Sequence, residues 1–302
     1  MHKRLALIGL PLAAALLTAC GGSDPYAEDG EGGGGAEAGS VVIGSADFPE
    51  STLLAEIYGR AMEAEGVDVT YQLSIGSREV YYSQIESGNL SVFPEYNGAT
   101  LAYLDDEAPS GNSEETNALV AEALPEGLEI LDSSSAENKD SVTVTAEIAR
   151  EHDLSTLADL ADVAGELTLG GPPEFETRQQ GVVGLADVYG VEFGEYRSLE
   201  VALLTQALMD GDIQAANLFT TDPQIAVEGL VVLEDPENLF GAQNITPLIN
   251  GEQVDETARG ALNAVSAALT TEALTSLNER VVVQNENAAD VAQEWLEQEG
   301  LA

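Results

Sequence analysis

The stretch S-G-N-L-S-V-F-P-E-Y-N-G-A-T, from Ser87 to Thr100, carries the strongest local signal for the fold. Its apolar run from Leu90 to Phe93 is typical of a short buried strand. Pro94 has no N–H to donate to a neighbouring strand, so we expect the strand to end there. Tyr96 and Asn97 would then follow the carboxyl end of a strand, which is where open α/β sheets bind ligands. An aromatic ring and an amide at this edge can hold a small polar or cationic molecule, although a lone Tyr can also simply pack beneath a loop.

Strands and helices alternate through the rest of the sequence. Apolar runs and period-two alternation predict strands at 41–44, 67–73, 90–93, 128–131, 142–144, 167–170, 213–218 and 230–233. Helical spacing predicts helices at 49–65, 80–85, 113–123, 146–152, 182–188, 201–209 and from 255 onward, and a capping box at 156–159 opens another. This alternation implies an α/β fold with a largely parallel sheet, and 302 residues leave room for two such blocks.

Polar or aromatic residues fall at the ends of several predicted strands. The three runs that follow a strand are Asp47-Phe48, Glu95-Tyr96-Asn97 and Phe219-Thr220-Thr221-Asp222, and the loop from Glu174 to Arg178 follows a fourth strand. Two α/β blocks that present such edges to each other form a cleft, which is a common place for a small ligand. Closure around the ligand would be a hinge motion.

The N-terminus has the pattern of an export signal. A charged start, His2-Lys3-Arg4, precedes the apolar run from Leu5 to Leu17. The sequence L-T-A-C, from Leu17 to Cys20, closes this run. The L-T-A-C sequence resembles the lipobox of bacterial lipoproteins, so we predict a signal peptide at 1–19 and lipid modification of Cys20. This is the single cysteine of the chain, which excludes an internal disulfide. The Gly-rich, acidic residues up to position 40 predict a flexible tether, and the mature protein would be anchored on the extracytoplasmic side of the cell membrane.

Composition argues against nucleic-acid binding and against most catalytic chemistry. The formal net charge of −44 repels phosphate backbones. The histidines are His2, in the predicted signal, and His152, at a charged helix end, and lipidation of Cys20 would remove the thiol. The sequence has no Walker A loop, no G-x-G-x-x-G fingerprint after a predicted strand and no G-x-S-x-G elbow. We therefore expect no catalytic residue, no metal site and no cofactor, although a glycosidase-type pair of carboxylates stays open because Asp and Glu are so abundant.

Several motifs in matching order resemble one protein family. They are Val42-Ile43-Gly44-Ser45 with Phe48-Pro49-Glu50, Phe93-Pro94-Glu95-Tyr96-Asn97-Gly98, Leu167-Thr168-Leu169-Gly170 with Pro173-Glu174-Phe175, and Phe219-Thr220-Thr221-Asp222-Pro223-Gln224-Ile225. Together they resemble the substrate-binding lipoproteins of osmoprotectant ABC importers, which take glycine betaine, carnitine, choline or proline betaine. The resemblance covers nearly the whole mature chain from Val41.

The resemblance implies a two-lobed periplasmic-binding-protein fold of the Venus-flytrap, type II-like class. Lobe 1 would comprise residues 41–135 plus 244–302, and lobe 2 would comprise residues 136–243. Such a protein captures a betaine-type solute in the cleft between the lobes, delivers it to an ABC permease in the membrane and does no chemistry itself. We expect it to be a monomer.

The resemblance also implies a set of ligand-binding residues. Tyr96 matches a ring of the family's aromatic cage, Phe219 stands where Tyr or Phe is usual, and Arg178 matches an Arg that follows the Pro-Glu-Phe motif. The chain departs from the family at Ser51, at the Asn138-Lys139-Asp140-Ser141 run and at Thr205, where relatives carry Gln or further rings. The full predicted set is Ser51, Tyr96, Asn97, Ser141, Arg178, Thr205, Phe219 and Asp222.

These departures leave alternatives open. A cage with fewer rings and more hydroxyl and amide groups favours another zwitterion or polar metabolite as the cargo of the same importer. A cell-wall-acting enzyme would instead need two facing carboxylates at a fixed separation in the cleft. A purely sensory or adhesive lipoprotein would have no permease partner.

Overall fold

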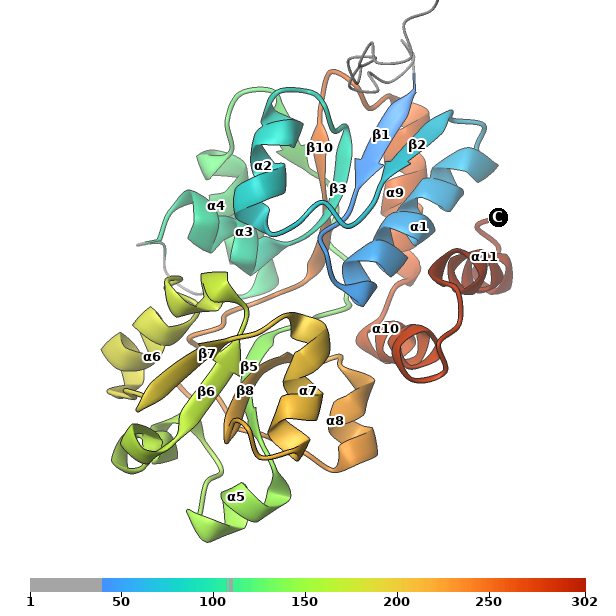
Figure 1. The fold of residues 1–302 in the computed structure, drawn as a ribbon. Helices are drawn as coiled ribbons and strands as arrows, with labels where there is room; N and C mark the ends of the chain where they lie inside the picture. The colour runs from blue at the N-terminus through green and yellow to red at the C-terminus, as the bar shows by residue number, and fades with distance from the viewer. Residues whose placement is uncertain (1–39, 107, 109–110) are drawn as a thin grey trace, which may run out of the picture. The chain divides into compact units, whose positions relative to one another are not determined.

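Two five-stranded sheets organise residues 40–106, 108 and 111–302, which are the residues that the computed structural model describes (Figure 1). The predicted signal peptide, Cys20 and all of the tether except Ser40 lie outside the described residues. We call the sheet that contains the first strand, with its helices, lobe 1, and the other sheet with its helices lobe 2. Two sheets, each packed with its own helices, agree with the predicted two-lobed α/β fold class. The structural comparisons below confirm this fold class.

The sheet of lobe 1 has the strand order β2-β1-β3-β10-β4. Its strands are β1 (Val41–Gly44), β2 (Val69–Gln72), β3 (Val92–Tyr96), β4 (Leu128–Ile130) and β10 (Ile245–Asn250). Its helices are α1 (Pro49–Ala64), α2 (Arg78–Glu86), α3 (Asn97–Leu104), α4 (Ser113–Ala123), α9 (Glu256–Ala268), α10 (Thr271–Asn278) and α11 (Ala288–Glu299), and a π-helical turn, Glu279–Val283, joins the last two.

The sheet of lobe 2 has the strand order β7-β6-β8-β5-β9. Its strands are β5 (Asp140–Val144), β6 (Thr168–Gly171), β7 (Glu195–Ser198), β8 (Ala215–Phe219) and β9 (Val231–Val232). Its helices are α5 (Ala146–Glu151), α6 (Val182–Tyr189), α7 (Val201–Met209) and α8 (Pro223–Glu228), with 3₁₀ turns at Leu157–Asp162, Ala164–Glu166 and Pro173–Glu176. The capping box predicted at 156–159 is present, and the helix that it opens is the first of these 3₁₀ turns.

The expectation of largely parallel sheets is wrong. Of the eight strand pairings in the described residues, four are parallel and four are antiparallel. The antiparallel pairings all involve β5 or β10. These two strands are the first that the chain forms after it passes from one sheet to the other, and each enters its new sheet between strands that run the opposite way.

The prediction that the strand ends at Pro94 is also wrong, because β3 continues to Tyr96. Pro94 lies opposite Pro247 of β10. In the next pair but one, the amides of Tyr96 and Ile245 donate elsewhere, to the Glu95 carboxylate and to the Ala136 carbonyl. Tyr96 and Ile245 therefore do not hydrogen-bond to each other. In an antiparallel ladder, hydrogen-bonded and non-hydrogen-bonded pairs alternate, so Pro94 and Pro247, two positions away, also form a non-hydrogen-bonded pair. A proline is tolerated at such a position, because no N–H is needed there.

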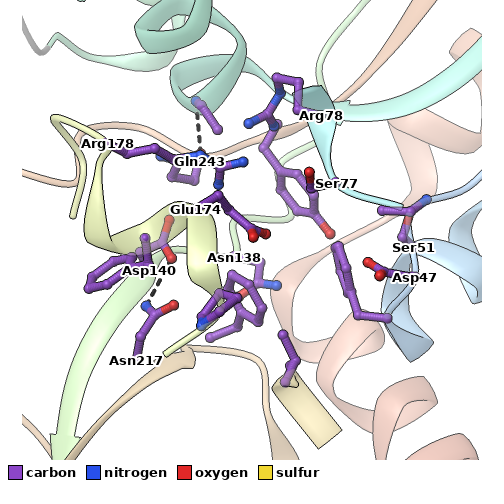
Figure 2. Close-up of a pocket in the computed structure, with 18 of the residues that line it drawn as sticks. Asp47, Ser51, Ser77, Arg78, Asn138, Asp140, Glu174, Arg178, Asn217 and Gln243 are labelled. Carbon is purple, nitrogen blue, oxygen red and sulfur yellow. Dashed lines mark hydrogen bonds between the residues drawn. The ribbon is translucent and has the colours of Figure 1, made fainter. Parts of the chain in front are cut away.

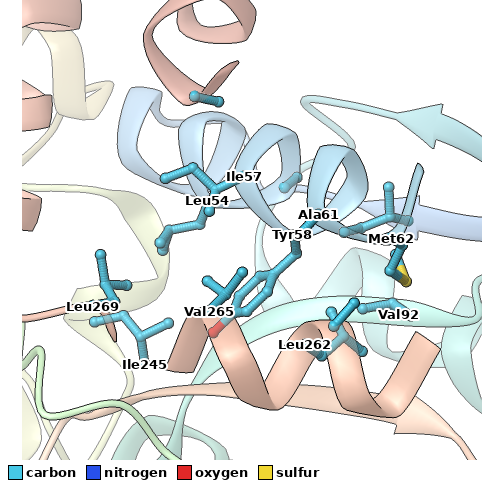
Figure 3. Close-up of a cluster of buried hydrophobic side chains, with 14 of the residues drawn as sticks. Leu54, Ile57, Tyr58, Ala61, Met62, Val92, Ile245, Leu262, Val265 and Leu269 are labelled. Carbon is cyan, nitrogen blue, oxygen red and sulfur yellow. The ribbon is translucent and has the colours of Figure 1, made fainter. Parts of the chain in front are cut away.

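Helix α1 anchors the core of lobe 1 and so positions its own N-terminus. Leu54, Ile57, Tyr58 and Ala61 recur at helical spacing and are at most 2% exposed. They pack toward the sheet and toward α9 (Figure 3). The Tyr58 hydroxyl lies 3.3 Å from the hydroxyl oxygen of Ser266. Each fully buried side chain of this size contributes about 1.5–3 kcal/mol. The N-terminal turn of α1 is thus held rigidly beside the ends of β1 and β3.

Neighbouring strand residues face opposite layers. Ile43 and Val92 belong to the core shared with α1 and α9, whereas Val42 and Phe93 belong to the core shared with α2. This alternation is the pleat of a strand that is buried on both faces. No helix among the described residues is both long enough and apolar enough to cross a membrane.

Gly98 is required by a close backbone contact. It lies inside α3, which the sequence did not predict, and it is not among the glycines with a left-handed backbone. A Cβ on Gly98 would lie 2.0 Å from the carbonyl oxygen of Ala242. Glycine is therefore needed here because the backbone before β10 approaches the helix closely.

Candidate ligand-binding site

A cavity of about 80 Å³ lies where the strand ends of the two lobes meet (Figure 2). A single buried water needs roughly 10–15 Å³ of such space. A cavity of this size therefore suits a small solute. Its charged lining residues are Asp47, Arg78, Asp140, Glu174 and Arg178, and its hydroxyl and amide residues are Ser51, Ser77, Asn138, Asn217 and Gln243. Six aromatic rings also line it, from Phe48, Tyr81, Phe93, Tyr96, Phe175 and Phe219.

Three of these rings connect the lobes across the cavity. Phe48 of lobe 1 stacks on Phe219 of lobe 2, with ring centroids 5.4 Å apart and an interplanar angle of 25°. The ring of Tyr96 lies 6.4 Å from that of Phe48. Phe48 is the N-cap of α1 and has an extended backbone, which Pro49 at the first helical position supports. Phe219 is the last residue of β8. The ends of β1, β3 and β8 therefore deliver one aromatic cluster.

Glu50 joins both lobes beneath this cluster. Its Oε1 accepts hydrogen bonds from the Tyr96 hydroxyl and from Asn138 Nδ2, both at 2.6 Å. Its Oε2 accepts hydrogen bonds from the Thr221 hydroxyl and from Asn278 Nδ2, both at 2.5 Å. The side chain is 6% exposed and lies in the first turn of α1, where the helix dipole favours a negative charge. Four donors from distant parts of the chain thus converge on one buried carboxylate.

The Glu50 contact also fixes the Tyr96 ring. Burial, followed by the nearby Glu50 carboxylate, raises the pKa of Tyr96 well above its ordinary value. The phenol therefore stays protonated and donates to Glu50. Because the hydroxyl is held by the protein, Tyr96 can offer a ligand only its ring.

A second buried carboxylate, Glu95, forms an ion pair with Arg78 next to the cavity. Arg78 donates through Nε at 2.9 Å and Nη2 at 2.7 Å, and the Tyr81 hydroxyl donates to the same carboxylate at 2.5 Å. Glu95 is 1% exposed and Arg78 is 7% exposed. Burial alone would raise the pKa of Glu95, but the charge and hydrogen bonds of Arg78 outweigh it, so the net direction is down. Arg78 therefore lines the cavity with its guanidinium already neutralised.

Arg178 is also paired, across the lobes. Its Nε and Nη2 donate to Glu79 of α2 at 3.0–3.2 Å, and the pair lies partly in solvent. A guanidinium can bind a ligand carboxylate bidentately through two such nitrogens, and in the structure these two contact Glu79. A second cavity of about 450 Å³ lies beyond this ion pair and shares Arg78, Asp140 and Arg178 with the first.

Asp140, the first residue of β5, lies on the lobe 2 side of the cavity. It accepts a 2.9 Å hydrogen bond from Asn217 Nδ2, which Figure 2 shows. Burial raises the pKa of Asp140. The described residues contain no group of three or more His, Cys, Asp or Glu side chains placed to hold a metal ion.

Four of the predicted site residues line the cavity and four do not. Ser51, Tyr96, Arg178 and Phe219 line it. The other four, Asn97, Ser141, Thr205 and Asp222, are absent from its lining.

Local contacts account for most of these absences. The Asn97 amide donates to Asn117 and Ser113, and the Ser141 hydroxyl donates to the Leu218 carbonyl. Asp222 caps α8 by accepting from the Gln224 amide. Thr205 is buried in α7. Of the hydroxyl and amide residues predicted for the site, Ser51 lines the cavity, and the other hydroxyl and amide groups of the lining come from Ser77, Asn138, Asn217 and Gln243.

Sequence reasoning passed over several lining residues. Asp47 and Phe48 were noted as a strand end, and Glu174 as part of a loop after a strand, but none of the three was assigned to the site. Position at a strand end was the signal that could have found them. Arg78 and Tyr81 come from α2, whose sequence carries no comparable signal.

Comparison with known proteins agrees with this geometry. The family described as "Substrate binding domain of ABC-type glycine betaine transport system" matches residues 39–298. The glycine betaine-binding protein YehZ of Escherichia coli is 26% identical over 276 residues, which cover 86% of this chain and 90% of YehZ. The carnitine transport binding protein OpuCC of Listeria monocytogenes is 23% identical over 271 residues, which cover 87% of this chain and 88% of that protein.

A solved structure supports the fold. The crystal structure of a glycine betaine/carnitine/choline ABC transporter matches with a TM-score of 0.70 and 23% identity, over 87% of this chain and 99% of that chain. At this identity the likeness shows the two-lobed fold alone. The family match spans most of the sequence, and the protein therefore belongs to the family of substrate-binding domains of ABC-type glycine betaine transport systems.

Proposed function

We propose that this protein is the solute-binding lipoprotein of an ABC importer and that it captures a small quaternary ammonium compound in the cavity between its lobes. The observation that carries the proposal is the aromatic cluster of Phe48, Tyr96 and Phe219, to which both lobes contribute. The names of the relatives, which refer to glycine betaine and carnitine, support this ligand class.

Cation–π attraction is the physical basis of the proposal. An aromatic face attracts a cation within about 6 Å by roughly 2 kcal/mol when the pair is desolvated. A trimethylammonium group cannot donate a conventional hydrogen bond, so rings and carboxylates recognise it better than amides do. Closure of the lobes around it would remove both the cation and the rings from water.

The family consists of the extracytoplasmic solute-binding components of ABC importers and not of enzymes. This removes the carboxylate-pair hydrolase that composition had left open. Membership of an importer family also argues against the purely sensory or adhesive lipoprotein. The remaining alternative is another zwitterionic or polar metabolite as cargo of the same importer, and the binding experiment below separates it from the proposal.

Replacing Phe219 by Leu is expected to weaken binding of a quaternary ammonium ligand by about 30-fold. Leucine keeps an apolar side chain of similar size but has no π face, so the loss reports on the ring rather than on packing. Isothermal titration of residues 40–302 with glycine betaine, choline and carnitine measures the effect. Phe219→Tyr, which keeps a ring, is the matched control and should change affinity by less than about three-fold.

Two outcomes would contradict the proposal. If none of the three solutes binds the unaltered protein at millimolar concentration, the cargo belongs to another chemical class. If Phe219→Leu binds as tightly as the unaltered protein does, the aromatic cluster is not the recognition element.

We further propose that Cys20 is lipidated after removal of residues 1–19, and that the protein acts as a monomer. The lipobox-like sequence before Cys20 supports the anchor. In a bacterium that matures lipoproteins, Cys20→Ser is expected to move the full-length protein from the membrane fraction to the soluble fraction. Equal membrane retention of both forms would contradict lipidation.

We also propose lobe boundaries at residues 41–135 plus 244–302 for lobe 1 and 136–243 for lobe 2. The strand membership of the two sheets supports this division, because the chain passes between them after β4 and again after β9. Limited proteolysis that cuts first at residues near 136 and 243 would agree with it, and preferred cutting inside either sheet would not.

A further inference from the structure

The charged groups of the cavity are unequal in number and in availability. Three carboxylates line it, those of Asp47, Asp140 and Glu174. Its two guanidiniums, Arg78 and Arg178, are each bound through Nε and Nη2 to a glutamate that lies outside this lining. With those glutamates included, five carboxylates face two guanidiniums, which is a formal net charge of −3.

The amide side chains of the lining are occupied as well. Asn138 Nδ2 donates to Glu50, and Asn217 Nδ2 donates to Asp140. Gln243 Nε2 donates to Gln180 and to the Phe240 carbonyl. The amide groups that could bind a ligand carboxylate are therefore engaged within the protein, and each guanidinium already has an ion-pair partner, whereas carboxylate acceptors face the cavity.

Asp140 is the carboxylate placed best to act on a ligand. It lies where the first cavity meets the second, and it lines both. The neighbouring charges that act on it are Arg178, Arg78 and Glu174, and both arginines are paired elsewhere. Asp140 thus faces the cavity beside two guanidiniums whose ion pairs are with Glu95 and Glu79 rather than with it.

We propose that this cavity selects a quaternary ammonium compound with a net positive charge over a zwitterionic betaine, and that Asp140 is the residue that sets this selectivity. The inference rests on the proposed function and narrows its ligand class. A trimethylammonium group satisfies the rings in either compound. A carboxylate at the other end of a betaine meets Asp140 and Glu174 with no unpaired guanidinium to receive it, whereas a hydroxyl donates to them.

Choline and glycine betaine are the probes, because they share the trimethylammonium group and differ in the group at the other end. We expect the unaltered protein to bind choline about ten-fold more tightly than glycine betaine at physiological salt. Asp140→Asn keeps the shape of the side chain and removes its charge. This variant should lower choline affinity about ten-fold and leave glycine betaine affinity unchanged or higher, so that the preference is lost.

The matched control must exclude a general effect of surface charge, because the whole chain carries a formal charge of −44. Asp162→Asn removes the same charge from an exposed position in lobe 2 that does not line the cavity. It should leave the choline to glycine betaine ratio unchanged. If Asp140→Asn does not fold, as judged by circular dichroism, Glu174→Gln supplies the second variant and should shift the ratio in the same direction.

The outcomes separate this inference from the function on which it rests. Tighter binding of glycine betaine than of choline overturns the inference and leaves the importer function in place. A ratio that stays unchanged in both cavity variants does the same. Failure of both probes to bind overturns the proposed ligand class, and the inference falls with it.

Discussion

Glu95→Gln is expected to lower the free energy of unfolding by about 3–5 kcal/mol. Three side-chain hydrogen bonds converge on this carboxylate, two from Arg78 and one from Tyr81. Glutamine is uncharged, so the variant leaves the guanidinium of Arg78 buried without a counter-charge. An uncompensated buried charge is far more costly than the loss of one ordinary hydrogen bond. Urea unfolding at neutral pH, followed by circular dichroism, measures the difference.

Glu79→Gln is the matched control, because Glu79 also pairs with an arginine but lies partly in solvent. Solvent screening reduces the worth of such a pair, and we expect a loss of no more than about 1 kcal/mol. A double variant, Arg78→Met with Glu95→Gln, removes the unpaired charge and should recover part of the loss. Equal losses in Glu95→Gln and Glu79→Gln would show that burial of the first pair contributes nothing.

The loss in Glu95→Gln should also depend on pH. The pKa of Glu95 is lowered in the folded protein from its ordinary value of 4.5. A carboxyl group with a lowered folded-state pKa stabilises the protein above its unfolded pKa, and this contribution disappears as the pH falls through the folded pKa. The difference in stability between the unaltered protein and Glu95→Gln should therefore be full at neutral pH and should narrow below about pH 4.5. A difference that grows on acidification would contradict this assignment.

Glu50→Gln is expected to lower the free energy of unfolding by at least about 3 kcal/mol, because two charge-assisted hydrogen bonds contribute about 1.5–3 kcal/mol each. Each oxygen of Glu50 accepts from two donors. The NH₂ group of a glutamine must replace one of these oxygens, and it would then face one hydroxyl, which can turn to accept, and one amide NH₂, which cannot. Thermal and urea unfolding of residues 40–302 measure the loss.

Two variants test whether Glu50 acts as the link between the lobes. Thr221→Val removes the hydroxyl of lobe 2 that donates to Glu50. Tyr96→Phe removes the phenol of lobe 1 that donates to Glu50. Each should lose about half of the Glu50→Gln effect or less. Tyr96→Phe keeps the ring, so it should also bind a quaternary ammonium ligand nearly as well as the unaltered protein does. Full stability of Glu50→Gln would show that the four contacts add nothing to the fold.

Local sequence signals predicted many elements of this protein well. The spacing of Leu54, Ile57 and Tyr58 predicted α1, and Pro49 predicted its start. The helix predicted at 113–123 is α4, and Asn112 precedes it in a full capping box. These signals work because a helix turn and its cap involve residues only three or four positions apart.

Strand signals were less reliable when pairing decided the outcome. Strand β10 was not predicted, and its Pro247 is a residue that argues against a central strand. It forms all the same, since Pro247 meets Pro94 at a position where neither needs an N–H. Helix α3 was also not predicted, and the glycine at position 98 within it is required by the close approach of the Ala242 carbonyl.

The sequence by itself determined the alternation of strands and helices, the strand ends at which Phe48, Tyr96 and Phe219 lie, and the motifs of the family. Each of these depends on residues that are near one another in the chain. Only the tertiary structure decided which donors reach Glu50, which carboxylates hold Arg78 and Arg178, and that Asp140 faces the cavity beside paired arginines. Glu50 and Asn278 lie 228 positions apart. A contact over such a separation depends on how two sheets and their helices pack, and no local pattern of residues records it.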